Sequence, residues 1–370
     1  MRRFSLKQKI DEFLSRFSVD IGVDLGTSNT LFYLKDKGIV IEEASLLARR
    51  KLKRWTGLSA PTRKKVRIIA YGQRAREMVD REAKQIEVIR LMKRGVVSDL
   101  EALENYLDYY LKLIYEIPSR GLKLFKPRII VGVPGSLTDV ERRAVRSVFL
   151  ALGVKKLFLV EQSLLAGIGM GLSTKSSSAL LIVDVGGAKT EASIVSSEGM
   201  VLTKSLKFGG DDWDDAIVSF LKMKYGMLIS RGRAEKVKRE IGCVWERKEG
   251  KEKVSVVRGR DLGTALPRSL RLRESEVKEA LMMLAMRMVA LVKELLDQMP
   301  EEVSDDVLNN GIRLVGGGAK LRGLDKLIEK ESGVPTGLIK GAELGVIRGC
   351  EKLIKDGDFL EKVKVWAINN

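Results

Sequence analysis

The sequence predicts an α/β fold of two related domains that close on a nucleotide. Three apolar, β-prone stretches each run into a glycine-rich turn; aspartate begins two of these turns, at Asp24 and Asp184, and the third covers Gly316 to Gly318. Glycine lets backbone N–H groups approach a phosphate closely. A chain of 370 residues is long enough for two domains, each with its own core. The order of the turns favours two half-molecules on opposite sides of one ligand.

The first turn lies in the stretch VDIGVDLGTSNTLFYL, which begins at Val19. Its apolar, β-prone ends predict a hairpin of two strands joined by a tight turn over 24–30. Asp24 stands at the end of the first strand. We expect it to hold Mg²⁺ through water, since Mg²⁺ keeps several waters and takes few carboxylates.

The second turn, DVGGAKTE over residues 184–191, departs from an ideal phosphate loop. The stretch ALLIV before it predicts a buried strand, and Gly186 and Gly187 suit a close approach of phosphate. Ala188 then stands where a third glycine would fit more easily, and Lys189 where a small polar residue would be expected. The pattern predicts nucleotide binding and leaves hydrolysis in question.

Residues 1–20 predict a separate amphipathic helix. At 3.6 residues per turn, its large apolar side chains fall within an arc of about 100°, the usual width of an apolar face. These side chains are Leu6, Ile10, Phe13, Leu14 and Phe17. Basic residues beside this face favour a helix that lies in a membrane interface. The alternative is a helix packed on the protein's own core.

The chain is strongly basic, with 67 Lys and Arg against 49 Asp and Glu and a formal net charge of +18. Such a charge favours anionic partners. Part of the excess lies in residues 49–67, a segment without acidic residues that is either a solvated loop or a surface for anionic lipid or nucleic acid. Its single aromatic residue, Trp55, does not make the stacking platform of a single-strand binder.

Composition also limits the chemistry. Histidine is absent, so Asp, Glu, Gln, Lys, Ser or Thr must supply any general base or metal ligand. Two cysteines, Cys243 and Cys350, predict neither a disulfide framework nor a metal cluster, which favours a reducing cytoplasm. No apolar run approaches the ~18–20 residues that span a bilayer.

Several motifs, in this order, resemble those of MreB, the bacterial actin homologue within the actin, Hsp70 and sugar-kinase superfamily. They include DLGTSNTLFYLKDKGIVIEEAS, PRIIVGVPGSLTDVERRAVRS, KFGGDDWDDAIVSFLKMKYG and VGGGAKLRGLD. The resemblance runs from about Ile21 to Leu353 and implies an actin-like (Hsp70 ATPase-type) two-domain fold with a nucleotide cleft. The implied domain I covers 21–165 plus 340–370, with a small subdomain at about 43–95. Domain II then covers 166–339.

The resemblance also implies a role for each residue of the cleft. Asp24 and Asp184 would position Mg²⁺ through water, and the ligand would be ATP, with GTP left open. The phosphates would lie against Thr27, Ser28, Asn29, Gly186, Gly187 and Ala188. Glu235 and Lys238 would contact the adenosine. The remaining wall would be Gly316, Gly317, Gly318 and Ala319.

Two departures from the family pattern affect positions that would take part in ATP hydrolysis. Where MreB usually reads Glu-Glu-Pro, with the second Glu orienting the attacking water, this chain has Gln162 followed by Ser163. Where MreB usually reads Gly-Gly-Gly-Thr-Thr, this chain has Ala188, Lys189 and Thr190 after two glycines. Gln162, Lys189 and Thr190 are therefore the candidate catalytic residues, and ATP hydrolysis is expected to be slow or lost. Lys189 could stabilise charge on the γ-phosphate, occupy the site of the water, or point to solvent.

The function implied is that of an ATP-dependent, membrane-associated filament of paired protofilaments that governs cell shape and positions wall synthesis. Its partners would be further copies of the chain, the anionic inner membrane and the membrane proteins of wall elongation. It would be cytoplasmic and peripheral on the inner face of the membrane, with Leu124 and Phe125 as a second membrane contact. The alternatives are a filament for DNA or organelle segregation and a monomeric sugar-kinase-like ATPase. The N-terminal helix disfavours nucleic acid as a partner.

Overall fold

The computed structural model describes residues 20–50, 67–79, 85–117, 128–154, 156–172, 178–196, 198–246, 251–363 and 366–369. The predicted membrane residues, Leu6, Ile10, Phe13, Leu14, Phe17, Leu124 and Phe125, lie outside these ranges, as does most of the basic segment 49–67. No helix in the described part of the chain combines the length and apolar character that crossing a bilayer requires.

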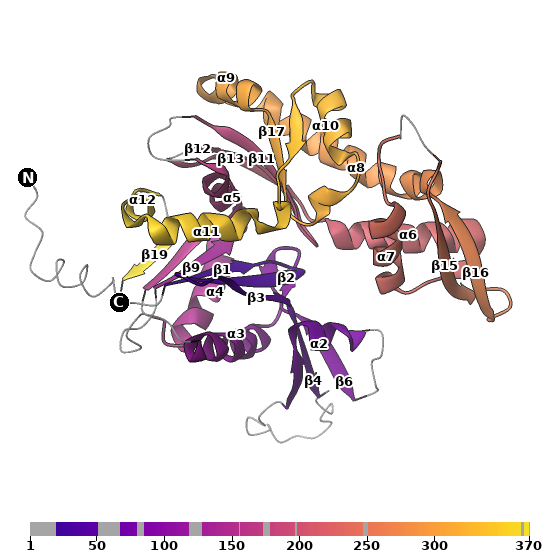
Figure 1. Ribbon diagram of the computed structural model, residues 1–370, viewed down its shortest axis with the longest axis horizontal. Helices are drawn as coiled ribbons and strands as arrows, with labels where there is room; N and C mark the ends of the chain where they lie inside the picture. The colour runs from indigo at the N-terminus through magenta and orange to yellow at the C-terminus, as the bar shows by residue number, and fades with distance from the viewer. Residues whose placement is uncertain are drawn as a thin grey trace, which may run out of the picture.

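A six-stranded sheet forms the centre of the first half of the molecule, in the order β19-β10-β9-β1-β2-β3 (Figure 1). Its strands are β1 (Ile21–Leu25), β2 (Asn29–Leu34), β3 (Gly38–Ala44), β9 (Arg128–Val133), β10 (Lys156–Glu161) and β19 (Trp366–Asn369). β1, β2 and β3 are antiparallel, whereas β9 and β10 continue the sheet parallel to β1. Apolar residues on one face, such as Val23 and Phe32, pack with α3 (Leu100–Glu116) and α4 (Asp139–Ala151).

A second sheet repeats this pattern in the order β13-β12-β11-β17-β18. Its strands are β11 (Leu180–Val185), β12 (Thr190–Ser196), β13 (Gly199–Leu206), β17 (Ile312–Val315) and β18 (Thr336–Leu338). β11, β12 and β13 are antiparallel, and β17 and β18 continue parallel to β11. β11 therefore occupies the place in this sheet that β1 occupies in the first. The duplicated arrangement confirms the predicted α/β fold.

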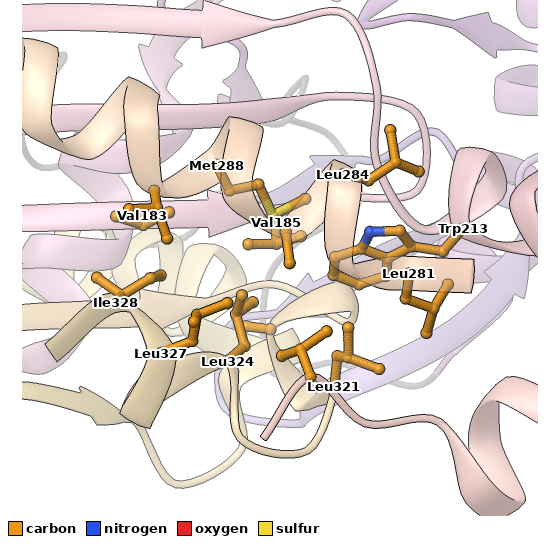
Figure 2. Close-up of a cluster of buried hydrophobic side chains, with 14 of the residues drawn as sticks. Val183, Val185, Trp213, Leu281, Leu284, Met288, Leu321, Leu324, Leu327 and Ile328 are labelled. Atoms are coloured by element: carbon orange, nitrogen blue, oxygen red, sulfur yellow. The ribbon is translucent and has the colours of Figure 1, made fainter. Parts of the chain in front are cut away.

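The core of the second half lies between this sheet and several helices, among them α8 (Glu274–Asp297), α9 (Glu301–Asn310) and α10 (Leu324–Ser332). Val183 and Val185 of β11 point into it, and the indole of Trp213 closes one end (Figure 2). Around them gather Leu281, Leu284, Met288, Leu321, Leu324, Leu327 and Ile328 (Figure 2). α8 thus buries one face along its length, as the spacing of its apolar residues requires.

Each half also carries a small three-stranded sheet. In the first half, β4 (Leu46–Arg50), β5 (Ile68–Tyr71) and β6 (Ile86–Arg90) lie beside α2 (Gly72–Arg76). In the second, β14 (Met227–Leu228), β15 (Val254–Asp261) and β16 (Pro267–Arg273) lie beside α6 (Gly210–Tyr225) and α7 (Arg231–Ile241). The remaining elements are β7 (Met92–Lys93), β8 (Val96–Val97), η2 (Gly318–Lys320), η3 (Ala342–Leu344) and α12 (Gly357–Lys362).

Two helices, α5 (Gln162–Met170) and α11 (Gly345–Lys355), cross between the two main sheets. A Cβ atom built on Gly349 would lie 2.0 Å from the Leu165 carbonyl oxygen, and one built on Gly169 would lie 2.6 Å from that of Gly345. Only glycine allows backbones to approach this closely. The same crossing buries apolar residues from both sheets, among them Leu31 and Ile182. The boundary expected for domain I, at residue 165, lies within α5, and the division into domains stays a prediction.

We expect Gly349→Ala to destabilise the protein, because the added methyl group has no space against α5. Overpacking of this kind costs about 1–3 kcal/mol of unfolding free energy. Gly345→Ala, in the same helix, is the matched control, since its Cβ would meet its nearest atom at an ordinary 3.4 Å. Thermal unfolding of both variants and the parent measures the difference. Equal midpoints would show that the helix crossing tolerates a side chain.

Candidate functional site

A cavity of about 890 Å³ lies between the two halves, in the size range of small-molecule sites. Residues from both main sheets and from both small subdomains line it. The predicted site residues that line it are Asp24, Thr27, Ser28, Asn29, Gln162, Asp184, Gly186, Gly187, Lys189, Glu235, Lys238, Gly316, Gly317 and Gly318. Ala188, Thr190 and Ala319 are not among the lining residues.

The β1–β2 turn and the β11–β12 turn meet across this cavity. A Cβ atom on Gly187 would lie 2.1 Å from the Ser28 hydroxyl oxygen, so glycine is needed where the two turns touch. Gly316 has a φ of +86°, and a Cβ there would lie 2.4 Å from Asp184 Oδ1. Backbone groups of three separate glycine turns therefore surround one space, as the sequence predicts for a phosphate site.

Asp24 and Asp184 stand at the carboxyl ends of the two equivalent strands, β1 and β11. Burial, with the charge of Asp184, raises the pKa of Asp24 to about 7, although a hydrogen bond from Gln162 Nε2 to Asp24 Oδ1 (3.0 Å) opposes the shift. Burial and the charge of Glu191 raise the pKa of Asp184 to about 6, with Lys189 opposing. Two buried carboxylates raise each other's proton affinity, and a cation between them has the opposite effect.

The described residues hold no group of three or more His, Cys, Asp or Glu that could bind a metal ion alone. Mg²⁺ is commonly bound by one or two carboxylates together with waters and substrate phosphates. Asp24 and Asp184 therefore fit an ion that arrives with a nucleotide, and do not fit a permanent structural metal.

Lys189 does not point to solvent, and that alternative is wrong. Its side chain is only 11% exposed, and its ammonium donates to Glu191 Oε2 and to the Ser136 hydroxyl. Glu191 also accepts hydrogen bonds from the backbone N–H groups of Gly135 (3.2 Å) and Ser136 (3.3 Å) and from the Ser163 hydroxyl (3.1 Å). This carboxylate thus joins β12 to the loop after β9 and to α5. Sequence reasoning overlooked Glu191, because a carboxylate inside a strand carries no motif of its own.

Thr190, a predicted catalytic residue, is fully buried in β12. Its hydroxyl donates to the Phe208 carbonyl oxygen at 3.0 Å, within the second half. Its side chain therefore stabilises the strand and stands away from the cavity.

Glu235 and Lys238 both line the cavity from α7, but each already has a partner. Both oxygens of Glu235 accept from Arg76 of α2 (3.0 and 3.1 Å), on the opposite side of the cavity. Burial opposes ionisation of Glu235, but Arg76 and the other nearby cations outweigh it and lower its pKa. Lys238 Nζ lies 2.8 Å from Asp214 Oδ1 and donates to the Gly210 carbonyl (2.6 Å).

A second ion pair crosses the cavity beside the first. Arg90 of β6 donates to Asp211 of α6 at 2.6 Å. All four residues of the two pairs line the cavity, and the pairs join α2 and β6 of one half to α7 and α6 of the other. Sequence reasoning missed Arg76 and Arg90, since partners this far apart in the chain leave no local pattern.

Comparison with known proteins agrees with this architecture. A family model described as MreB/Mbl protein matches residues 18–362. The chain is 36% identical to the cell shape-determining protein MreB of Escherichia coli (strain K12) over 346 residues, 94% of this chain and 96% of that protein. It is 33% identical to the cell shape-determining protein Mbl of Bacillus subtilis (strain 168) over 349 residues, 94% of this chain and 99% of that one.

Solved structures give the same result. MreB5 of Spiroplasma citri bound to ADP matches with a TM-score of 0.82 at 28% identity, over 91% of this chain and 96% of that chain. The MamK double helical filament shares the fold, with a TM-score of 0.73 at 19% identity over 92% and 99% of the two chains. The predicted actin-like fold is confirmed, and the chain belongs to the MreB/Mbl family.

Proposed function

We propose that the chain is an ATP-dependent, membrane-associated cytoskeletal protein that forms filaments, governs cell shape and positions wall synthesis. The observation that carries this proposal is the pair of equivalent strands, β1 and β11, whose terminal aspartates and glycine turns face one cavity. Relatives named cell shape-determining proteins and a structural neighbour solved as a filament support the functional part.

We infer that the ligand is a nucleotide with Mg²⁺. MreB5 of Spiroplasma citri has been solved with ADP and with AMPPNP, which supports a nucleotide here. Asp24 and Asp184 would hold the ion, and the β1–β2 and β11–β12 turns would donate backbone N–H groups to the phosphates. When bound, the ion would neutralise phosphate charge.

Hydrolysis is proposed to be slow. Gln162 and Lys189 occupy the two positions that usually handle the attacking water in this family. Here Gln162 donates to Asp24, and Lys189 is held by Glu191 and Ser136. The Lys189 ammonium therefore points toward Glu191 and Ser136. Lysine also lacks the hydroxyl with which the family's threonine would hold the attacking water. Thr190 offers none either, because its hydroxyl is committed to Phe208.

Attachment to the membrane rests on residues 1–20 and on Leu124 and Phe125, and is proposed from the sequence. Full burial of a large apolar side chain contributes about 1.5–3 kcal/mol, and each basic residue near an anionic leaflet about 1 kcal/mol. Interfacial burial is partial, so the net binding free energy is smaller.

The test of the whole proposal is assembly of the purified chain. With Mg·ATP and anionic vesicles, we expect filaments on the vesicle surface by electron microscopy. Deleting residues 2–17 should abolish co-sedimentation with vesicles and leave filaments free in solution. Vesicle binding that survives the deletion would contradict the proposed anchor, and a chain that remains monomeric under all conditions would contradict the filament.

The affinity for Mg·nucleotide should depend on pH through Asp24. Its pKa of about 7 means that the carboxylate is largely ionised at pH 8 and largely protonated at pH 6. Only the ionised form attracts the cation, so affinity should fall about tenfold as pH is lowered from 8 to 6. Titration with a fluorescent nucleotide, with and without Mg²⁺, measures the effect.

Asp24→Asn is the control for this titration, because it removes the ionising group and retains the size of the side chain. Its weaker binding should fall only about twofold between pH 8 and pH 6, through Asp184 with its pKa of about 6, apart from titration of the nucleotide itself. If parent and variant change in parallel, the nucleotide phosphate is responsible and Asp24 is not.

Restoring the family residues should accelerate hydrolysis. Loss of a water-positioning group commonly costs 10²-fold in rate, about 2.7 kcal/mol of barrier. We therefore expect Lys189→Thr with Gln162→Glu to raise single-turnover phosphate release by up to about 10²-fold, with little change in nucleotide affinity. Both positions act on the same water molecule, so the effects of the two single substitutions on the hydrolysis rate should not be additive.

Lys189→Met separates the two roles open to Lys189, because it removes the ammonium without supplying a hydroxyl. If the only effect of Lys189 is that it supplies no hydroxyl to hold the water, phosphate release by Lys189→Met should be as slow as in the parent. Release by Lys189→Thr should then be faster. Slower release in both variants would mean that Lys189 stabilises the transition state, and would overturn the proposal of slow hydrolysis.

A further inference from the structure

The carboxylate of Glu191 is a buried centre of hydrogen bonds beside the phosphate turns. The residue lies in β12, and its side chain is only 5% exposed. Its Oε1 accepts from the Gly135 backbone N–H (3.2 Å) and from the Ser163 hydroxyl (3.1 Å). Its Oε2 accepts from the Ser136 backbone N–H (3.3 Å) and from the Lys189 ammonium. A buried carboxylate with four donors has a fixed position, so it can hold a flexible neighbour in place.

Lys189 is that neighbour, and its side chain lies along the wall of the cavity. A Cβ atom built on Gly95, in the turn between β7 and β8, would lie 3.0 Å from Lys189 Cδ and 3.6 Å from Pro134 Cγ. The methylene stem therefore packs against the first half, and the ammonium ends between Glu191 and the Ser136 hydroxyl. Lys189 and Glu191 both line the cavity. A positive charge at the cavity wall is thereby paired with a carboxylate of the chain.

Two departures from the family pattern meet at this carboxylate. Lys189 stands where the family usually has threonine, Ser163 stands where it usually has proline, and both donate to Glu191. Proline has no hydroxyl and threonine has no cationic group, so the usual residues could not make these contacts. Two substitutions that are far apart in the sequence therefore act on one side chain. This arrangement is specific to the present chain and points to a difference in how its cavity treats phosphate.

We propose that Glu191 is a positioning residue that keeps the Lys189 ammonium away from the terminal phosphate of a bound nucleotide. By the resemblance above, position 189 lies where the attacking water meets the γ-phosphate, and an ammonium on a flexible four-carbon stem would reach that phosphate if it were free. Such a contact would favour the ligand with the additional charged phosphate. With Lys189 held by Glu191, the cavity binds nucleoside triphosphate and diphosphate with similar affinity. The inference rests on the nucleotide site proposed above and adds how that site treats the third phosphate.

Glu191→Gln tests the inference, because glutamine keeps the size of the side chain and removes its charge. Whichever way the new amide turns, Lys189 loses its counter-charge, and its ammonium should then move to the γ-phosphate. Isothermal titration calorimetry of the full-length chain with Mg²⁺ measures the affinities for ATP and ADP separately. We expect the parent to bind the two nucleotides within about threefold of each other. The variant should bind ATP about tenfold more tightly and change its ADP affinity by less than about threefold.

Three further variants identify the group responsible. Lys189→Met in the Glu191→Gln background should abolish the gain, because the gain depends on the freed ammonium. Ser136→Ala removes the other partner of Lys189 and leaves the buried carboxylate intact, so it should raise ATP affinity alone by about threefold even if Glu191→Gln does not fold. Glu42→Gln is the matched control, since it removes a carboxylate of the cavity wall that forms no ion pair with a described residue. It should leave the ratio of ATP to ADP affinity unchanged.

Four results would overturn the inference. If Glu191→Gln weakens ATP and ADP equally and lowers the unfolding midpoint, the hydrogen bonds of Glu191 only join the two halves. If the gain in ATP affinity survives Lys189→Met, the lost carboxylate charge is responsible and the lysine is not. If the parent prefers ATP by more than about tenfold and Lys189→Met removes that preference, Lys189 already binds the phosphate. An unchanged ratio in both Glu191→Gln and Ser136→Ala would show that Lys189 cannot reach it.

In each of these cases the parent still binds nucleotide, so the proposed nucleotide site stands and only the role of Glu191 is wrong. A parent that binds neither ATP nor ADP overturns both.

Discussion

The glycine-lined crossing of α5 and α11 is the constraint on which the rest of the structure depends. α11 packs on β1, β2 and β9 of the first sheet, α5 packs on β11 and β12 of the second, and the two backbones touch at Gly349 and Leu165. Their separation sets the distance between β1 and β11, and hence between the two turns that face the cavity. A larger residue at the crossing would move one half-molecule relative to the other. The position of Asp24 opposite Asp184 is therefore a consequence of helix packing as much as of the turns.

The electrostatics of the cavity follow from this arrangement. Bringing two strand ends together places two carboxylates in a buried space, and burial raises their pKa values, with the charge of Asp184 adding to the shift of Asp24 and the charge of Glu191 adding to that of Asp184. The lysine nearest to them, Lys189, is committed to Glu191. Other cationic side chains that line the cavity, such as Arg76 and Lys238, are likewise paired with carboxylates of the chain. That distribution is suited to binding and contributes little to activating a water.

Local patterns in the sequence were sufficient to predict the strands and turns around the cavity. Apolar, β-prone runs beside Asp and Gly identified β1, β2 and β11, and the order of the glycine turns predicted the duplicated fold. The direction in which each side chain points could not be predicted from these local patterns. Lys189 lies next to the predicted phosphate turn, but its partner Ser136 comes from another part of the chain. Arg76 and Arg90 were missed for the same reason, as their partners are fixed only by the tertiary fold.

The ion pairs Arg76–Glu235 and Arg90–Asp211 join α2 and β6 of the first half to α7 and α6 of the second, outside the α5–α11 joint. The helix crossing is therefore the axis about which the two halves would rotate, and the two ion pairs lie away from that axis. A small rotation about this axis would move the paired side chains apart by a larger distance. Even individually weak ion pairs therefore resist opening of the cavity between the two halves. Because the paired side chains are partly exposed, ionic strength can weaken these two interactions, whereas the α5–α11 joint depends on buried apolar contacts that salt does not screen.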